Sequence, residues 1–221
     1  MSLLKVLHYG HPLLRQRAEE VAGVDQNTLD IIHDMAVTMY ENDGVGLAGP
    51  QVGVMQRIFV ADVGRLPDEE DADPDLLGAD AAVEEEDDDE EEDDDDGYGQ
   101  DTLMVFINPE IVDESPDDGP YEEGCLSIPG VRGEVYRPLR VRVRARDERF
   151  EPFEVEATGL LARVIQHELD HLNGVLFIDH LPLMKRGLLA GDLNRIKRVA
   201  TEELPSLEGA AYPIVVAADP A

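Results

Sequence analysis

Apolar residues recur at three- and four-residue steps between Thr158 and Gly174, and this spacing predicts an amphipathic helix. Thr158 is a suitable N-cap, and Gly174 stands where a left-handed residue commonly ends a helix. The apolar positions form one wide stripe: Leu160, Leu161, Val164, Ile165, Leu169 and Leu172. We therefore expect a central helix that is buried over much of its surface.

Two other segments have a helical period. Asp25 is a good N-cap for a helix that runs to about Asn42, in which His33 is expected at the surface. The stretch from Leu183 to Val199 predicts a last helix, and the chain from about residue 205 is expected to be a loosely held tail. The first of these helices has an apolar face formed by Leu29, Ile32, Ala36 and Met39.

Strict alternation of apolar and charged residues predicts strands. The segments Arg140 to Arg146 and Pro152 to Ala157 both alternate, and the turn near Asp147 joins them into a hairpin. Its outer face is expected to pair arginines with glutamates across the strands. Arg57 to Val63 and Thr102 to Asn108 are also expected to be strands, in one common sheet.

The net charge of −32 is concentrated in one block of this 221-residue chain. Residues 67–101 contain 21 Asp or Glu and no Lys or Arg, and the run from Glu84 to Asp96 is an unbroken series of 13 acids. Such a run repels itself and buries nothing, so we expect a disordered insertion between two strands of a single domain spanning residues 1–221. An acidic surface also repels phosphate, which argues against nucleic-acid binding.

The single cysteine, Cys125, excludes an intrachain disulfide and favours a reducing compartment. No secretory signal is visible at the N-terminus, and no run approaches the 18 apolar residues of a membrane span. These features predict a cytoplasmic protein without a membrane partner.

His167 and His171 are four residues apart on the central helix, so both rings lie on one face and can bind one metal ion. Glu168 beside them is a candidate general base. The same pattern also occurs in ordinary helices with two partly exposed histidines. A zinc or ferrous site needs a third protein ligand, and Cys125, which follows Gly124, completes a suitable set. A free cysteine can equally be a plain core residue.

Four glycines and a proline lie between Asp43 and Gly53, which is incompatible with a regular helix. The segment is either a flexible loop or a place where backbone approaches a ligand. A phosphate-binding loop is disfavoured because the terminal Lys-Ser/Thr is missing. Gln51 is the side chain here that can donate a neutral hydrogen bond into a site.

Three motifs now carry a resemblance to peptide deformylases, in the order found in that family. They are Gly44-Val45-Gly46-Leu47-Ala48-Gly49-Pro50-Gln51, Glu123-Gly124-Cys125-Leu126-Ser127 and Gln166-His167-Glu168-Leu169-Asp170-His171. The similarity covers about Leu4 to Leu181, apart from the acidic insertion. Gly49 departs from the alanine that is usual at this position, a change we expect to affect only local stiffness.

The resemblance implies an α+β fold with antiparallel strands packed around a metal-binding helix. It also implies a hydrolase that removes the N-formyl group from the N-terminal formylmethionine of nascent polypeptides at the ribosome and releases formate. One Fe(II) per chain would be held by Cys125, His167 and His171, with Zn or Ni able to substitute. Glu168 would accept a proton from the attacking water and pass it to the leaving amine.

The remaining site residues implied by the resemblance surround the formyl group and the methionine side chain. The Leu126 backbone N–H and the Gln51 side-chain amide would stabilise the charge on the formyl oxygen. Val45 and Gly46, with the adjacent Gly44, would contact the peptide backbone. Residues expected to form the apolar pocket for methionine are Val45, Ile128, Ile165 and His167.

Two other functions compete with this interpretation. A zinc protease of the His-Glu-x-x-His type would take a downstream third ligand, for which His180 is available, but Cys125 would then have no role. A non-enzymatic binding module would use the acidic run to capture basic partners, and it would leave the three motifs unexplained.

Overall fold

A computed structural model describes residues 3–64 and 102–207. The acidic insertion expected at 67–101 lies outside the described residues, and so does the tail after residue 207. Within the described part of the chain, no helix has the length and apolar character needed to cross a membrane.

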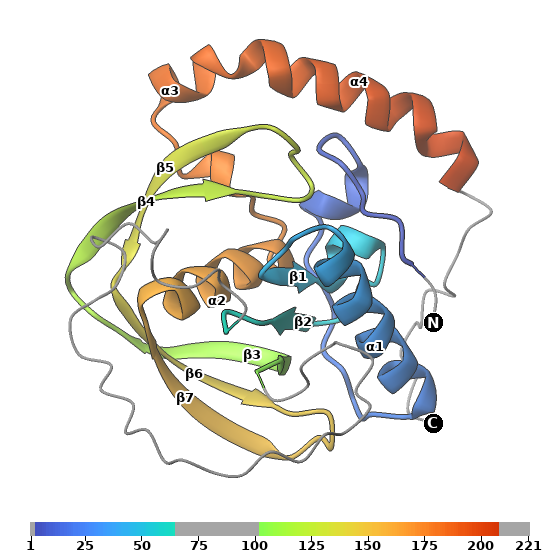
Figure 1. Cartoon of the computed structure of the whole chain (residues 1–221), viewed down its shortest axis with the longest axis vertical. Coiled ribbons are helices and arrows are strands. Elements are labelled where there is room, and N and C mark those ends of the chain that lie inside the picture. The colour runs from blue at the N-terminus through green and yellow to red at the C-terminus, as the bar shows by residue number, and fades with distance from the viewer. Residues whose placement is uncertain (1–2, 65–101, 208–221) are drawn as a thin grey trace, which may run out of the picture.

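The central helix is α2, Gly159–Leu172, and its bounds match the pattern of apolar residues. Thr158 occupies the N-cap position, although its side chain makes no capping hydrogen bond. Gly174 adopts a φ of +74°, the left-handed conformation expected for the residue that ends the helix. Figure 1 shows α2 in the middle of the molecule, between the strands of two sheets.

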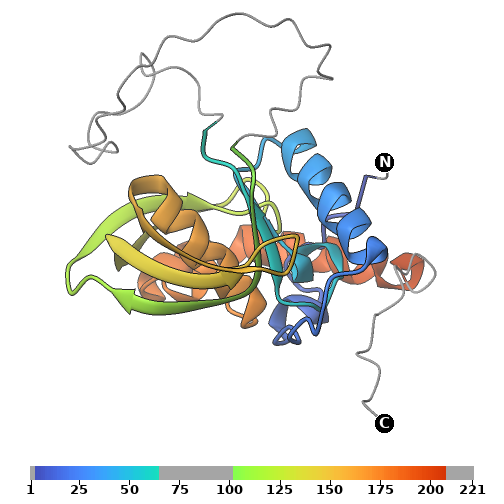
Figure 2. The ribbon, with the colours of Figure 1, turned by 90° about the horizontal axis from the view of Figure 1, so that it is seen from below.

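The larger sheet has five strands in the order β1-β2-β3-β6-β7, and every neighbouring pair is antiparallel. Helix α2 packs against β1, β2, β6 and β7, and Figure 2 shows the β6–β7 hairpin lying across it. This arrangement confirms the α+β fold with antiparallel strands around a central helix. The strands are β1 Gly46–Ala48, β2 Ile58–Ala61, β3 Met104–Glu114, β6 Arg140–Arg146 and β7 Pro152–Thr158.

The third strand is longer than the sequence pattern predicted, because it continues past Asn108 to Glu114. Asn108 has a φ of +52°, and the register of β3 on β6 shifts between Ile107 and Glu110. Pro109 lacks an N–H for the ladder, so the strand is interrupted by a bulge but does not end there.

A second sheet of two strands, β4 Asp118–Gly124 and β5 Arg132–Pro138, was not predicted as a hairpin. The inward positions of β4 are occupied by Gly119 and Glu123, and one of those of β5 by Arg137. These two strands therefore lack the regular alternation of apolar and polar residues from which a strand is predicted.

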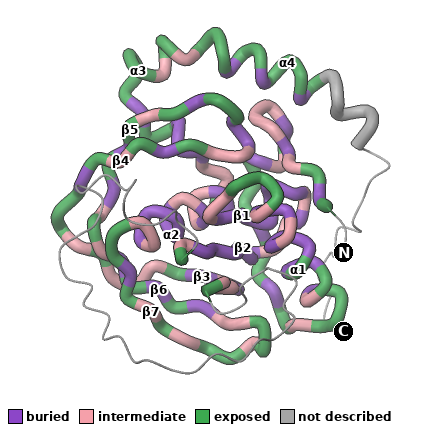
Figure 3. Tube along the Cα trace, in the orientation of Figure 1, coloured by how far each residue is buried: buried purple, intermediate pink, exposed green. Residues whose placement is uncertain are grey.

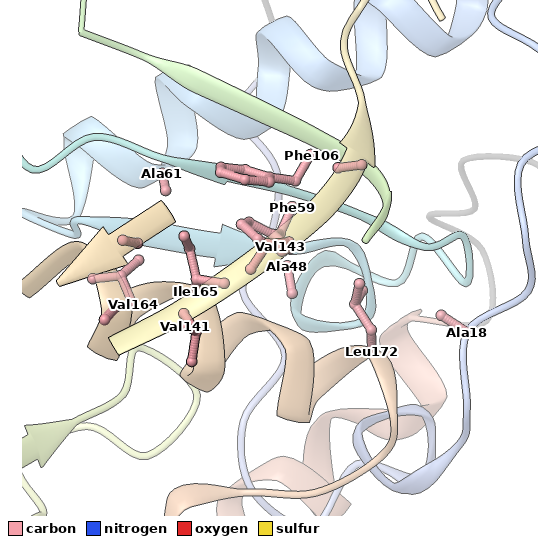
Figure 4. Close-up of a cluster of buried hydrophobic side chains, with 13 residues drawn as sticks. Ala18, Ala48, Phe59, Ala61, Phe106, Val141, Val143, Val164, Ile165 and Leu172 are labelled. Atoms are coloured by element: carbon pink, nitrogen blue, oxygen red, sulfur yellow. The ribbon is translucent and has the colours of Figure 1, made fainter. Parts of the chain in front are cut away.

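The core beneath α2 is a cluster in which Phe59 and Phe106 stack with ring centroids 4.5 Å apart. Figure 4 shows Ile165 of α2 directed into this cluster, close to Val143. Fully burying an aliphatic or aromatic side chain contributes roughly 1.5–3 kcal/mol. The burial pattern in Figure 3 places α2 among the buried strands β1 and β2, so the cluster holds the helix against the sheet.

In the described part of the chain, three α-helices lie outside this centre. Helix α1, Gln26–Glu41, begins as predicted at Asp25, whose side chain accepts a hydrogen bond of 2.8 Å from the Thr28 N–H, and His33 is exposed. The single helix predicted from Leu183 to Val199 is instead two helices, and the second continues past residue 205. Their bounds are α3 Leu183–Leu188 and α4 Ala190–Leu207.

Candidate metal centre and active site

Helix α2 places His167 and His171 one turn apart, and the turn after β4 brings Cys125 to the same point. One ligand atom from each of these three residues lies within 4.8 Å of the others. The Cys125 Sγ is 3.2 Å from His171 Nε2. The structure therefore brings the three predicted metal ligands together, although Cys125 and His171 are 46 residues apart in the sequence.

The chemistry of this donor set fits a metal ion. His167 Nδ1 lies 2.9 Å from a Glu123 carboxylate oxygen, which leaves Nε2 of the ring for a metal, as in many metal sites. Burial lowers the pKa of His171 well below its usual value, so this ring is neutral as a ligand must be. A thiolate and two imidazoles suit zinc or ferrous iron and leave a position for water.

A chain of ion pairs, buried around Arg137 and more exposed at His180, holds the His167 ring through Glu123. Arg137, with only 4% of its surface exposed, donates to Glu123 through Nε at 2.6 Å and Nη2 at 3.0 Å. Its Nη1 donates to Asp170 at 2.7 Å, and the same Asp170 oxygen is 2.8 Å from His180 Nε2. Burial alone would raise the pKa of Glu123, but the hydrogen bonds from His167 and Arg137 prevail and lower it to about 2. Glu123 is thus a fixed anion that orients the His167 ring.

Glu168 has the opposite electrostatic environment. Desolvation by burial raises the pKa of Glu168 to about 7. Its Oε2 atom is buried and has no hydrogen-bond partner among the described residues. A Cβ on Gly46 would come within 2.6 Å of Glu168 Oε1, so the β1 backbone approaches the carboxylate as only glycine permits. Glu168 is therefore a buried carboxylate with a raised pKa, held against the β1 backbone.

Gln51 extends from the short 3₁₀ helix Gly49–Val52 towards the cluster of metal-ligand residues Cys125, His167 and His171. Its Oε1 accepts from the Ala48 N–H at 2.7 Å, and its Nε2 lies 3.5 Å from Cys125 Sγ and 3.4 Å from Ser127 Oγ. The amide hydrogens consequently face the cluster. The glycine-rich segment is ordered into β1 and this 3₁₀ helix, so it is not simply a flexible loop. A Cβ on Gly49 would lie 2.6 Å from the Val54 carbonyl oxygen, so the departure at this position affects backbone packing as well as stiffness.

A cavity of about 700 Å³ opens beside the cluster. Its walls are one face of α2, residues 44–46 and part of β4. Ile128, as predicted, and Leu126 also line it. The prediction that Ile165 lines the methionine pocket is wrong, because Ile165 is fully buried in the hydrophobic core between α2 and the five-stranded sheet. At 100° per residue, Ile165 points away from the cavity face that Val164 and Glu168 share. The α2 residues in the wall are Leu160, Arg163, Val164, His167 and Glu168.

Sequence reasoning missed Arg137, Arg163 and the role of Glu123. The only signal for Glu123 was its place next to Gly124-Cys125, and nothing local marked either arginine. His180, the alternative third ligand, binds Asp170 and is not part of the ligand cluster. The protease alternative required His180 as its third metal ligand, and the structure does not place His180 with the other ligands. Cys125 occupies that position in the cluster.

A helix bearing His-Glu-x-x-His, wrapped by antiparallel strands and completed by one cysteine beside a cavity, defines a metal-dependent hydrolase. Comparison with known proteins identifies which one. A family model described as polypeptide deformylase matches residues 3–187. The chain therefore belongs to the polypeptide deformylase family, and it removes the N-formyl group from the formylmethionine of nascent polypeptides.

Relatives and solved structures agree with this family. The chain is 40% identical over 217 residues to the peptide deformylase of Salinibacter ruber, covering 98% of this chain and 96% of that protein. It is 42% identical over 181 residues to the enzyme of Clostridium botulinum, covering 81% and 97%. A Plasmodium falciparum peptide deformylase structure has a TM-score of 0.73 at 31% identity, covering 90% of this chain and 98% of that one. These matches leave no support for the acidic binding module as the main function.

Proposed function

We propose that deformylation takes place in the cavity beside Cys125, His167 and His171, with Glu168 as the general acid and base. The observation that carries this proposal is the convergence of the three ligand atoms within 4.8 Å of one another, next to a buried carboxylate. When bound, a metal ion would supply a Lewis acid and activate water there. The proposed ion is Fe(II), with Zn or Ni able to substitute, since the donors suit all three.

Glu168 has the properties that proton transfer requires. Burial raises the pKa of the Glu168 carboxyl from its ordinary value towards neutrality, and a carboxylate with a raised pKa is a better proton acceptor and donor near neutral pH. Glu168 is buried and lines the cavity, so its carboxylate lies beside the space proposed for the substrate. We assign Glu168 to taking the proton of the attacking water and delivering it to the amine that leaves.

Gln51 and Leu126 are placed to stabilise the formyl oxygen as negative charge develops on it. The Gln51 amide is oriented by its own Oε1, which is held by the Ala48 N–H, and it faces the cluster through Nε2. Leu126 lies in the cavity wall directly after Cys125, so its backbone N–H is proposed as the second donor. Preorganised donors of this kind are worth about 10²–10³-fold in rate each.

The substrate backbone is proposed to lie along β1. Among the described strands, β1 is at the edge of the five-stranded sheet and pairs with β2 alone. Gly44, Val45 and Gly46 line the cavity. An extended peptide can pair with such an edge through main-chain hydrogen bonds. Ile128 remains assigned to the methionine pocket.

We propose that residues 1–221 belong to one catalytic domain, with the acidic segment 67–101 as an insertion in it. We also propose that the enzyme acts in the cytoplasm on nascent chains near the ribosome, since those chains carry the formyl group.

The test is the variant Glu168→Gln, which preserves shape but cannot accept the proton. With metal content measured on the same anaerobic sample, we expect retained metal and formate release from a formyl-Met peptide reduced by about 10²–10⁴-fold. Glu154→Gln on the exposed β7 strand is the matched control and should release formate at the wild-type rate. Near-wild-type release by metal-loaded Glu168→Gln protein would overturn the assignment. The metal analysis of the wild type also decides whether iron is the ion bound.

A further inference from the structure

Ser127 is a fully buried serine two residues after the ligand residue Cys125. Its Oγ lies 3.4 Å from the Nε2 atom of Gln51, which comes from the 3₁₀ helix Gly49–Val52. A buried hydroxyl needs a hydrogen-bond partner, and the Gln51 amide provides one. Gln51 lines the cavity and Ser127 does not, so any influence of Ser127 on a substrate must pass through Gln51.

The orientation of the Gln51 amide is fixed by its oxygen. Oε1 accepts a hydrogen bond of 2.7 Å from the Ala48 N–H, which an amide nitrogen cannot do. The Nε2 atom is therefore on the other side, 3.4 Å from Ser127 Oγ and 3.5 Å from Cys125 Sγ. Because an amide nitrogen carries two hydrogens, one can be donated to Ser127 while the other is directed towards the metal-ligand cluster.

The same N-terminal segment holds the backbones of both residues. The Leu7 N–H donates to the Gln51 carbonyl oxygen at 2.7 Å, and the Tyr9 N–H donates to the Ser127 carbonyl oxygen at 2.8 Å. Gln51 and Ser127 are 76 residues apart in the chain, so these two bonds help to set the distance between their side chains. Both residues are buried, and the amide is consequently ordered before a substrate binds.

We propose that Ser127 is a positioning residue whose hydroxyl oxygen accepts one hydrogen of the Gln51 amide and thereby keeps the other directed at the formyl oxygen. The inference deepens the proposed function and rests on Gln51 donating to that oxygen. A donor stabilises developing charge most when its orientation is set in advance, because nothing then has to reorganise during the reaction. Without the hydroxyl, Nε2 would lose its oxygen acceptor and the amide would be directed less firmly.

The competing explanation is that Ser127 only suits the turn after β4. The Ile128 N–H donates to the Cys125 carbonyl oxygen at 2.9 Å, which places Ser127 inside a tight turn that favours small polar residues. A purely structural serine would affect stability or metal binding, and its effect would not depend on the side chain at position 51. The two explanations therefore differ in whether the effects of Ser127 and Gln51 are coupled.

The experiment is a double-mutant cycle on zinc-loaded protein, made of Ser127→Ala, Gln51→Met and the double variant, with kcat and KM measured for one formyl-Met tripeptide. Ser127→Ala should lower kcat by about five- to tenfold, the size of one hydrogen bond, and change KM less than about twofold. In the Gln51→Met background the same change should lower kcat no further, because the group through which Ser127 acts is absent. An equal loss in both backgrounds would overturn the inference.

Two further variants control for burial and for shape. Thr38 is also fully buried and lies outside the cavity wall, and its Oγ1 accepts from the Leu4 N–H at 2.9 Å. Thr38→Val should lower unfolding stability and leave kcat unchanged. Ser127→Thr retains the hydroxyl and should keep kcat within about twofold of the wild type. Unchanged kcat in folded, metal-loaded Ser127→Ala protein would show that Ser127 is only structural.

The wild type tests the inference whether or not a variant folds. In crystals of the zinc protein with formate, the reaction product, Gln51 Nε2 should lie within hydrogen-bond distance of both Ser127 Oγ and a formate oxygen. An amide turned away from Ser127 in that complex would overturn the inference. Failure of the proposed function would appear differently, as undiminished formate release by metal-loaded Glu168→Gln or Gln51→Met protein.

Discussion

The molecule contains two groups of arginine–carboxylate pairs with similar distances and opposite environments. On the β6–β7 hairpin, Arg144 and Glu154 approach to 2.8 Å with 57% and 45% of their side chains exposed. Next to the ligand residue His167, Arg137 and Glu123 approach to 2.6 Å with 5% of each side chain exposed. The same chemical pair therefore has a different consequence in each place, and the difference lies in access to water.

Exposed pairs gain little, because water and salt screen the charges and ordering two long side chains costs entropy. A buried pair has lost its hydration, so each charge depends on its partner. Arg137 compensates two carboxylates, Glu123 and Asp170, and through Glu123 it fixes the orientation of His167. The buried group thus couples stability to the metal site, whereas the hairpin pairs leave that site unaffected.

The largest effect is expected for Arg137→Met. Removing this guanidinium leaves two buried carboxylates without a counter-charge, which typically costs 3–5 kcal/mol, so we expect a loss of about that size in urea unfolding. Metal affinity should weaken by about 10–100-fold, because the group that orients His167 is lost. Arg144→Met is the control. Unchanged stability and metal affinity in Arg137→Met would mean that the buried network does not support the site.

The next largest effect is expected at low pH, where protonation of the buried Glu123 should reduce stability. The folded pKa of Glu123, about 2, lies below its ordinary value of 4.5, so its ionised form stabilises the fold above pH 4.5. This contribution, of the order of 3 kcal/mol, is lost as pH falls from about 4.5 to about 2. Unfolding of metal-free wild type and Glu123→Gln protein, measured across that range, should show the loss only in the wild type. Parallel pH profiles would contradict the prediction.

A smaller effect is expected at the outer end of the network. His180 lies 2.8 Å from Asp170, but 35% of its side chain is exposed, so water can replace it. We expect His180→Ala to cost about 0.5–1.5 kcal/mol, the usual contribution of one hydrogen bond. Metal affinity should change less than threefold, since Arg137 still holds Asp170. A loss of metal equal to that of Arg137→Met would make His180 an essential part of the support.

The smallest effect is expected on the hairpin. Arg144→Met should change unfolding stability by less than about 1 kcal/mol, and the difference should shrink in 1 M salt, where the screening length is only about 3 Å. Thermal unfolding at low and high salt measures it. A salt-independent loss of several kcal/mol would show that exposed pairs here behave like buried ones.

The sequence predicted the parts of the fold that follow a simple period. Helix α2, with both histidines on one face, follows from local spacing, and so does the β6–β7 hairpin with its Arg–Glu pairs. The β4–β5 hairpin was missed because its inward positions include Gly119, Glu123 and Arg137, which carry no hydrophobic signal. The site was harder to predict where function requires polar residues inside the protein.

By itself the sequence determined the three motifs, their order and the chemistry of a thiolate, two imidazoles and a carboxylate. These properties depend on residue identity and on helical geometry over a few positions. Only the tertiary structure decided that Ile165 packs in the core while Arg163 lines the cavity, and that Arg137 joins Glu123 to Asp170. Such contacts join strands and a helix that are distant in sequence, and burial then sets the energy of each charge according to what surrounds it.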